Sequence, residues 1–196
     1  MPRIRAATVA EHRAAQRAAL LDAARDLLAE NAEDTERAPS LADVARRAGL
    51  ARSSVYSYFT SRDDLLDALI VDTFPRWAAY VRERMEKACT PGERVLAYVD
   101  ANLHLVARGD HALARALAAT SRTDTLAKSS RLLHDDLASP LRTALTEHGA
   151  PDPVRTGELV QSIVYTLSRM IEDGLAEASA QRLGHELLTP YLRDAT

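Results

Sequence analysis

Apolar side chains recur every three or four positions along most of the chain, a spacing typical of amphipathic helices. Thr8 and Glu11 have the spacing of a capping box, which favours a helix start at this point. A polar, acidic loop over residues 31–39 is expected to follow this helix and to point away from any anionic partner. The apolar residues that share one face of this first helix are Leu20, Ala24, Leu27 and Leu28.

The next stretch, SLADVARRAGLARSSVYSYFTSR over residues 40–62, contains two short helical patterns separated by a glycine. Ser40 is suited to cap the first of them, and Gly49 is suited to end it. The second pattern predicts a short helix over Arg52 to Tyr58. This layout predicts a helix-turn-helix, whose second helix enters the major groove of duplex DNA. Positions predicted to face the core are Leu41, Val44, Ala45, Ala48, Val55 and Phe59.

A fourth helix is predicted from about residue 63, with Leu65, Leu66, Leu69 and Ile70 as its buried stripe. Pro75 is expected to kink or restart this helix. Further helices are predicted over 91–107, 112–119, 126–148, 153–175 and 180–193, and Pro140 is expected to interrupt the third of them. The predicted fold class is all-α, with a three-helix DNA-binding head over residues 1–62 and a helical body over residues 63–196.

Charge supports this division of the chain. The net charge is −3, but residues 1–62 carry ten Arg against eight acidic residues, whereas residues 63–196 carry 15 basic against 20 acidic residues. Positive charge therefore gathers in the part predicted to meet DNA.

The lone cysteine, Cys89, excludes a disulfide within the chain, and a reducing cytoplasmic setting is the default expectation. The uncharged stretch over residues 159–168 has ten residues, far fewer than the roughly 20 needed to span a bilayer. No membrane partner is therefore expected.

The second helix of the motif offers the side chains that read base edges, which are short hydroxyls and Arg. Arg52, Ser53, Ser54 and Ser57 are the candidates for base contacts. Tyr56, Tyr58, Arg62 and Ser40 are the candidates for phosphate contacts. The alternative is an ordinary helical hairpin with solvated serines and core tyrosines.

The run VARRAGLARSSVYSYFTSRDDLLDAL resembles the helix-turn-helix signature of the TetR (tetracycline-repressor) family. The resemblance covers about 50 residues and implies a homodimer whose recognition helices enter adjacent major grooves. It also implies a C-terminal domain that binds a small-molecule effector. Ala51 departs from the pattern, because members often have a capping Ser there, and Arg62 replaces the commoner Lys.

For the body, the resemblance implies that the last two long helices pair with those of a second copy. The alternative is that the apolar stripes of these two helices pack into the core of a single chain. The candidate dimer residues are Val160, Ile163, Val164, Leu167, Ile171, Leu187, Leu188 and Tyr191. Candidate effector-binding residues on the predicted body helices are Trp77, Tyr80, Tyr98, His104, Tyr165 and Met170.

These features favour a ligand-responsive transcriptional regulator, in the first place a repressor. It would bind a pseudo-palindromic operator as a dimer and leave that operator when its small-molecule effector binds. The alternative is an activator, or a DNA-binding protein of the same fold that is controlled by a protein partner and has no small-molecule ligand. An enzyme is not expected, because the sequence has no Gly-rich phosphate loop and no nucleophile elbow. The six histidines show no metal-ligand spacing, so neither a metal nor a cofactor is predicted.

Overall fold

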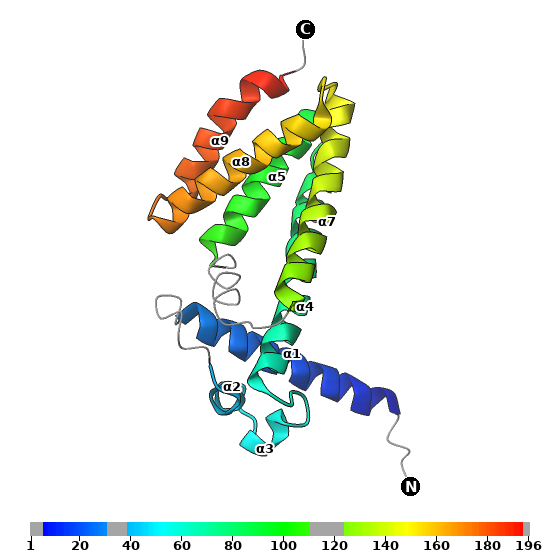
Figure 1. The fold of residues 1–196 in the computed structure, drawn as a ribbon, viewed down its shortest axis with the longest axis vertical. Coiled ribbons are helices and arrows are strands. Elements are labelled where there is room, and N and C mark those ends of the chain that lie inside the picture. Colours follow the sequence, from blue (N-terminus) through cyan, green and yellow to red (C-terminus); the bar gives the residue numbers. More distant parts are fainter. Residues whose placement is uncertain (1–5, 31–38, 110–123, 194–196) are drawn as a thin grey trace. The chain divides into compact units, whose positions relative to one another are not determined.

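The computed structural model describes residues 6–30, 39–109 and 124–193, and within these ranges every regular element is a helix (Figure 1). The predicted all-α class is therefore confirmed. The predicted short helix over 112–119 and residues 31–38 of the predicted loop lie outside the described residues. The helices are α1 (Ala6–Glu30), α2 (Leu41–Arg47), α3 (Arg52–Val55), α4 (Arg62–Glu86), α5 (Pro91–Ala107), α7 (Thr125–His148), α8 (Pro153–Glu172) and α9 (Glu177–Leu192).

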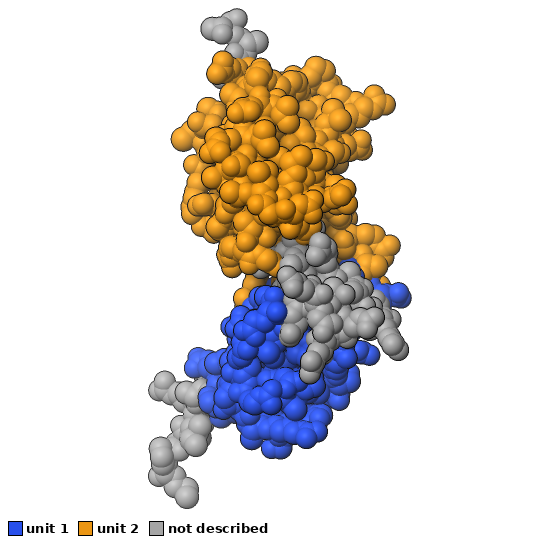
Figure 2. Space-filling view, turned by 90° about the vertical axis from the view of Figure 1, so that its left-hand side faces the viewer, with its two compact units in different colours: residues 1–72, 112–126 blue, residues 73–111, 127–196 orange. Residues whose placement is uncertain are grey.

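The chain divides into two compact units (Figure 2). Unit 1 comprises residues 1–72 and 112–126, and unit 2 comprises residues 73–111 and 127–196. The division falls inside α4, so that unit 1 contains the helix-turn-helix together with the first part of α4.

Unit 1 is built around the turn between α2 and α3. The Ser40 hydroxyl accepts from the Asp43 amide at 3.2 Å, and the Asp43 carboxylate accepts from the Ser40 amide, which completes a capping box. At the other end of α2, Gly49 has φ +69° and Leu50 N–H donates to the Ala45 carbonyl at 2.9 Å. This is the Schellman arrangement, and it fixes the direction in which the chain enters α3.

The recognition helix is shorter than predicted. Its α-helical part is Arg52–Val55, and the chain continues as hydrogen-bonded turns in which Ser57 and Tyr58 N–H donate to the Ser54 and Val55 carbonyls. Ala51 supplies no side-chain cap, and the Ser57 hydroxyl donates to the Ser54 carbonyl at 2.7 Å. Such local bonds compete with regular helix, which explains the early end. We call residues 52–58 the recognition segment.

Pro75 was predicted to kink or restart the helix, and the restart is wrong, because α4 is one uninterrupted helix with this proline inside it. Pro75 removes the donor that would satisfy the Val71 carbonyl one turn earlier. Both residues are exposed, and Val71 is 56% accessible, so water can solvate that carbonyl. In the same way, Pro140 does not interrupt α7.

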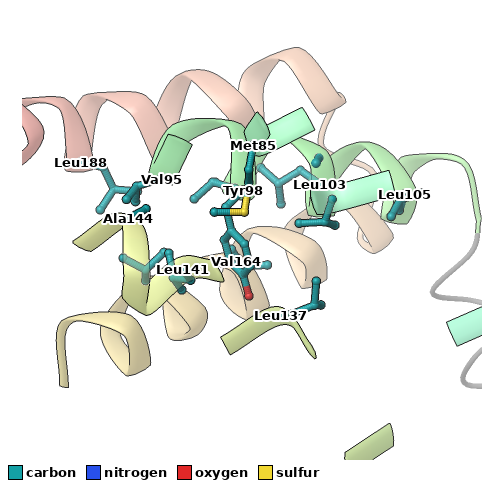
Figure 3. Packing of buried hydrophobic residues seen from close by; sticks show 14 of the residues in the cluster. Met85, Val95, Tyr98, Leu103, Leu105, Leu137, Leu141, Ala144, Val164 and Leu188 are labelled. Carbon is teal, nitrogen blue, oxygen red and sulfur yellow. The ribbon is translucent and has the colours of Figure 1, made fainter. Parts of the chain in front are cut away.

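The core of unit 2 draws side chains from α4, α5, α7, α8 and α9 (Figure 3). Tyr98 of α5 lies at its centre and is 1% exposed, with Val164, Leu141 and Met85 around it. α5 matches its predicted bounds, whereas α8 ends and α9 begins earlier than predicted. Gly184 of α9 allows close packing, because an added Cβ would lie 3.2 Å from Leu167 and 3.4 Å from Val99.

Candidate DNA-binding site and effector clefts

The recognition segment presents a polar surface above a buried anchor. Val55 and Phe59 are 0% and 1% exposed, as the sequence predicts, and they hold the segment against unit 1. Arg52, Ser53 and Ser57 are exposed, and Ser54 is half-buried. The exposed side chains match the chemistry that reads base edges.

Tyr56 and Arg62 are also exposed, at the end of the recognition segment and at the start of α4. Tyr56 is 49% accessible, which leaves its hydroxyl available to a phosphate. The Asp64 carboxylate, by contrast, turns back to accept from the Thr60 amide at 2.8 Å. The Asp64 carboxylate is thus engaged locally, whereas Asp63, next to Arg62 in the sequence, is exposed.

Two predicted phosphate contacts are already engaged within unit 1. The Tyr58 hydroxyl donates to Gln16 Oε1 of α1 at 2.6 Å, and its ring is half-buried. The Ser40 hydroxyl donates to Asp43 Oδ2 at 2.6 Å, which places a carboxylate beside it. Ser40 hydrogen bonds lower the pKa of Asp43, so that carboxylate remains anionic and would repel a phosphate. We therefore assign Ser40 a capping role and Tyr58 a role in unit 1 packing.

Unit 2 contains a polar cleft of about 360 Å³ between the end of α4, α5 and the start of α9, which we call the α4–α5–α9 cleft. The His104 ring stacks on Tyr80 with centroids 5.7 Å apart, and its Nδ1 lies 2.9 Å from Glu177 Oε1. These two aromatic residues were predicted to line an effector site, and the structure brings them together.

Asp100 is a further group in the α4–α5–α9 cleft, and sequence reasoning missed it. Its carboxylate lies 2.9 Å from His185 Nε2 of α9. Burial raises the pKa of Asp100, and the hydrogen bond and charge of His185 oppose that rise. The available signal was the four-residue spacing of Asp100 and His104, which places two titratable side chains on one face of α5.

A second cleft of about 380 Å³ lies between α5, α7 and α8, and we call it the α5–α7–α8 cleft. Tyr98, Leu141 and Gly157 line it, with His134 and Arg142 of α7 also in its wall. The Tyr98 hydroxyl donates to Gln161 Oε1, and burial raises the Tyr98 pKa well above its ordinary value. This phenol is therefore a neutral hydrogen-bonding group.

Residues 20–69 match the sequence profile of the bacterial regulatory proteins of the tetR family. The matched range contains α2, α3 and the turn between them, which are the parts that form the candidate DNA surface. The chain carries the DNA-binding domain of the TetR family. Unit 1 is thus a TetR-family head, and the helix-turn-helix prediction is confirmed.

The fatty acid metabolism regulator protein of Bacillus subtilis strain 168 is 27% identical to this chain over 95 residues. That alignment includes 48% of this chain and 47% of the relative, so the match spans about half of the length of each protein.

Solved structures share the fold over most of this chain. FadR from Bacillus subtilis in complex with stearoyl-CoA has a TM-score of 0.66 and 20% identity, over 87% of this chain and 96% of that one. AibR in complex with isovaleryl coenzyme A and operator DNA has a TM-score of 0.67 and 18% identity, over 88% and 98% of the two chains. At these identities the likeness establishes the fold.

The remaining predicted effector residues do not lie in the two clefts. Trp77 is buried in the unit 2 core, where its indole N–H donates to Asn102 Oδ1 at 2.9 Å. Tyr165 and Met170 of α8 are 60% and 41% exposed. We therefore correct the assignment of these three residues from pocket to core and to outer surface.

The predicted dimer residues divide into two groups. Val160, Val164, Leu167 and Leu188 are at most 6% exposed within one chain, so the intramolecular alternative holds for them. Ile163 and Ile171 are half-buried, and Leu187 and Tyr191 are 64% and 44% exposed. An exposed apolar strip on α8 and α9 remains, and its large members are Leu159, Tyr165, Met170, Leu183, Leu187 and Tyr191.

In the described ranges, His, Cys, Asp and Glu side chains form no group of three or more that could hold a metal ion. Likewise, no described helix combines the length and the apolar character that crossing a membrane requires.

Proposed function

We propose that this protein is a transcriptional repressor that binds a pseudo-palindromic operator as a homodimer and leaves it when an acyl-coenzyme A thioester binds unit 2. The exposed recognition segment on a TetR-family head carries this proposal. Arg52, Ser53 and Ser57 reach base edges from the segment, and Tyr56 and Arg62 bind flanking phosphates. Ser54 is half-buried and contributes at the edge of the same surface.

The exposed apolar strip on α8 and α9 supports the homodimer. A two-fold interface uses the same surface on both chains, so one self-complementary strip is sufficient. Leu187 and Tyr191 of α9 and Leu159 of α8 are large, exposed apolar side chains that a second copy would cover. We therefore place the dimer contact on this strip and not on the buried stripe beneath it.

The effector class is proposed from two fold relatives and one cleft. FadR is described in complex with stearoyl-CoA, and AibR in complex with isovaleryl coenzyme A. The α5–α7–α8 cleft, at about 380 Å³, falls within the roughly 300–1,000 Å³ typical of small-molecule pockets. Leu141 and Gly157 supply an apolar wall for an acyl chain, and Arg142 supplies a cation for the phosphates.

Release follows from a difference in effector affinity between two states of the dimer. Two recognition segments must enter grooves about 34 Å apart on one face of the duplex. An effector that binds more tightly to a dimer with another spacing shifts the population away from the DNA-bound state. No catalytic step is part of this function, which takes place in the cytoplasm.

The direct test measures binding of the full chain to DNA upstream of its own gene, with acyl-CoA added. We expect two chains per duplex and a fall in bound DNA on addition of stearoyl-CoA or isovaleryl-CoA, with coenzyme A alone as the control. A complex that both thioesters leave intact would overturn the effector assignment. A chain that binds no upstream DNA would overturn the function as a whole.

The second candidate is a partner-controlled DNA-binding protein without a small-molecule ligand. A closed interior of unit 2 would favour it. The two clefts of about 360 and 380 Å³ in unit 2 favour the ligand-responsive function instead.

A further inference from the structure

The N-terminal half of α1 carries two arginines on the same face as its buried residues. Leu20 and Ala24 are fully buried in the unit 1 core, whereas residues 9–15 are exposed. Arg13 and Arg17 precede Leu20 by seven and three positions, so the helical period places them on the core-facing side of α1. The inner face of α1 therefore continues past the edge of the core as a basic face.

This basic face lies directly against the end of the recognition segment. The Arg13 guanidinium stands 5.8 Å from the centroid of the Tyr58 ring, and that of Arg17 stands 5.7 Å from the Phe59 ring. Between them, Gln16 accepts the hydrogen bond of the Tyr58 hydroxyl. Three α1 side chains thus contact two consecutive residues of the helix-turn-helix, which fixes the register of α1 against it.

The arginines of unit 1 differ in their acidic partners. Arg25 pairs with Asp72, Arg46 with Asp43, and Arg47 with Glu30, at 2.5–2.8 Å. Among the described arginines of unit 1, four form no ion pair, and all four are exposed on α1 or at the recognition segment and its flank. They are Arg13, Arg17, Arg52 and Arg62.

A guanidinium that stacks on a ring retains its charge and most of its five N–H donors. The stacking energy at an exposed site is about 0.5–1 kcal/mol, enough to orient the side chain but too little to satisfy its charge. Arg13 and Arg17 lie four positions apart on one helix, where like charges destabilise each other, and an anionic ligand relieves that repulsion. Arg52 and Arg62 belong to the proposed DNA surface, so duplex DNA is the anion that Arg13 and Arg17 would meet as well.

We propose that Arg13 and Arg17 of α1 bind backbone phosphates beside the groove that the recognition segment enters, with Tyr58 as the positioning residue for Arg13. This inference rests on the proposed DNA-binding function and extends it to a second structural element. It also gives Tyr58 an indirect part in DNA binding, since its own hydroxyl is engaged by Gln16.

The test compares the salt dependence of DNA affinity for Arg13→Ala and Arg17→Ala with that of the wild-type chain. Each lost phosphate contact lowers the slope of log affinity against log salt by about 0.9, which is about 3.5-fold per chain between roughly 50 and 200 mM. We expect this loss to be equal on the operator and on a scrambled duplex. Arg13→Lys should restore the slope, because it restores the charge.

Arg47→Ala is the matched control. It removes the same charge from unit 1, but at the opposite end of α1, where Arg47 pairs with Glu30. It should leave the slope unchanged. Tyr58→Phe keeps the ring and should keep the slope, whereas Tyr58→Leu should lower it as Arg13→Ala does. The double variant Tyr58→Leu with Arg13→Ala should lower it no further, since both act on one contact.

An unchanged slope in Arg13→Ala and Arg17→Ala, in a series where Arg52→Ala weakens operator binding, would overturn this inference and leave the proposed function intact. A wild-type chain that binds no duplex DNA would overturn the proposed function itself.

Discussion

At the residue scale, Arg52 and Arg62 differ in what surrounds them. Arg52 begins α3 and is exposed beside Ser53, on the surface that enters the groove. Arg62 begins α4, after the turn that holds Thr60 against the Asp64 carboxylate. The first position suits base readout, and the second suits a backbone contact that carries no sequence information.

Arg52→Ala should therefore relax sequence preference, with a loss of about 1–3 kcal/mol on the operator and a smaller loss on scrambled DNA. Arg62→Ala should weaken binding to the operator and to scrambled DNA about equally. Fluorescence anisotropy titrations on the two duplexes measure the difference. An equal loss on both duplexes for Arg52→Ala would remove this residue from base readout.

Periodicity identified the buried residues of unit 1 well, because burial follows from spacing along one helix. Val55, Phe59 and Leu65 are at most 1% exposed, as predicted. The side-chain partners of the Tyr58 and Ser40 hydroxyls were not predicted, since each depends on one particular neighbouring side chain. Gln16 lies 42 positions from Tyr58 in the sequence, and no pattern within residues 40–62 reveals that pairing.

At the scale of the element, local stop signals decided which boundaries were predictable. The bounds of α5 were predicted correctly because both ends carry local signals. Thr90 forms a capping box, Pro91 occupies the first turn, and Gly109 has φ +89° just beyond the end. α3 ended early because local hydrogen bonds, such as that of the Ser57 hydroxyl to the Ser54 carbonyl, replace the regular helical pattern there. α4 continued through Pro75, since the exposed face there tolerates a missing hydrogen bond.

The contact between the start of α5 and the end of α9 gives an element-scale prediction. A Cβ added at Gly92 would lie 2.7 Å from the Leu192 carbonyl oxygen, which is backbone and cannot swing aside. Gly92→Ala should therefore destabilise unit 2 by about 1–3 kcal/mol. A thermal melt should show this as a fall of about 2–4 °C for each kcal/mol.

Gly157→Ala is the control for that melt. Its added Cβ would make only ordinary contacts, the nearest 3.7 Å from Leu145, and Ala favours helix over Gly. The control should be neutral or slightly more stable than the wild-type chain. A Gly92→Ala variant that melts at or above the wild-type temperature would contradict the close approach of α5 and α9.

At the scale of the whole molecule, the two units have separate cores and a shared task. The TetR-family head carries the proposed DNA surface, and unit 2 carries the two clefts and the exposed apolar strip on α8 and α9. The sequence predicted the helix-turn-helix head and the helical body. It did not separate buried from exposed members of the apolar stripes, because both faces of α8 carry large apolar residues.

Selection of bound duplexes from random DNA tests the central claim most directly, because it presupposes no operator. The account predicts enrichment of two inverted half-sites whose centres lie about one helical turn or a multiple of it apart, bound by two chains. Failure to enrich any sequence, or enrichment of a single half-site bound by one chain, would contradict it.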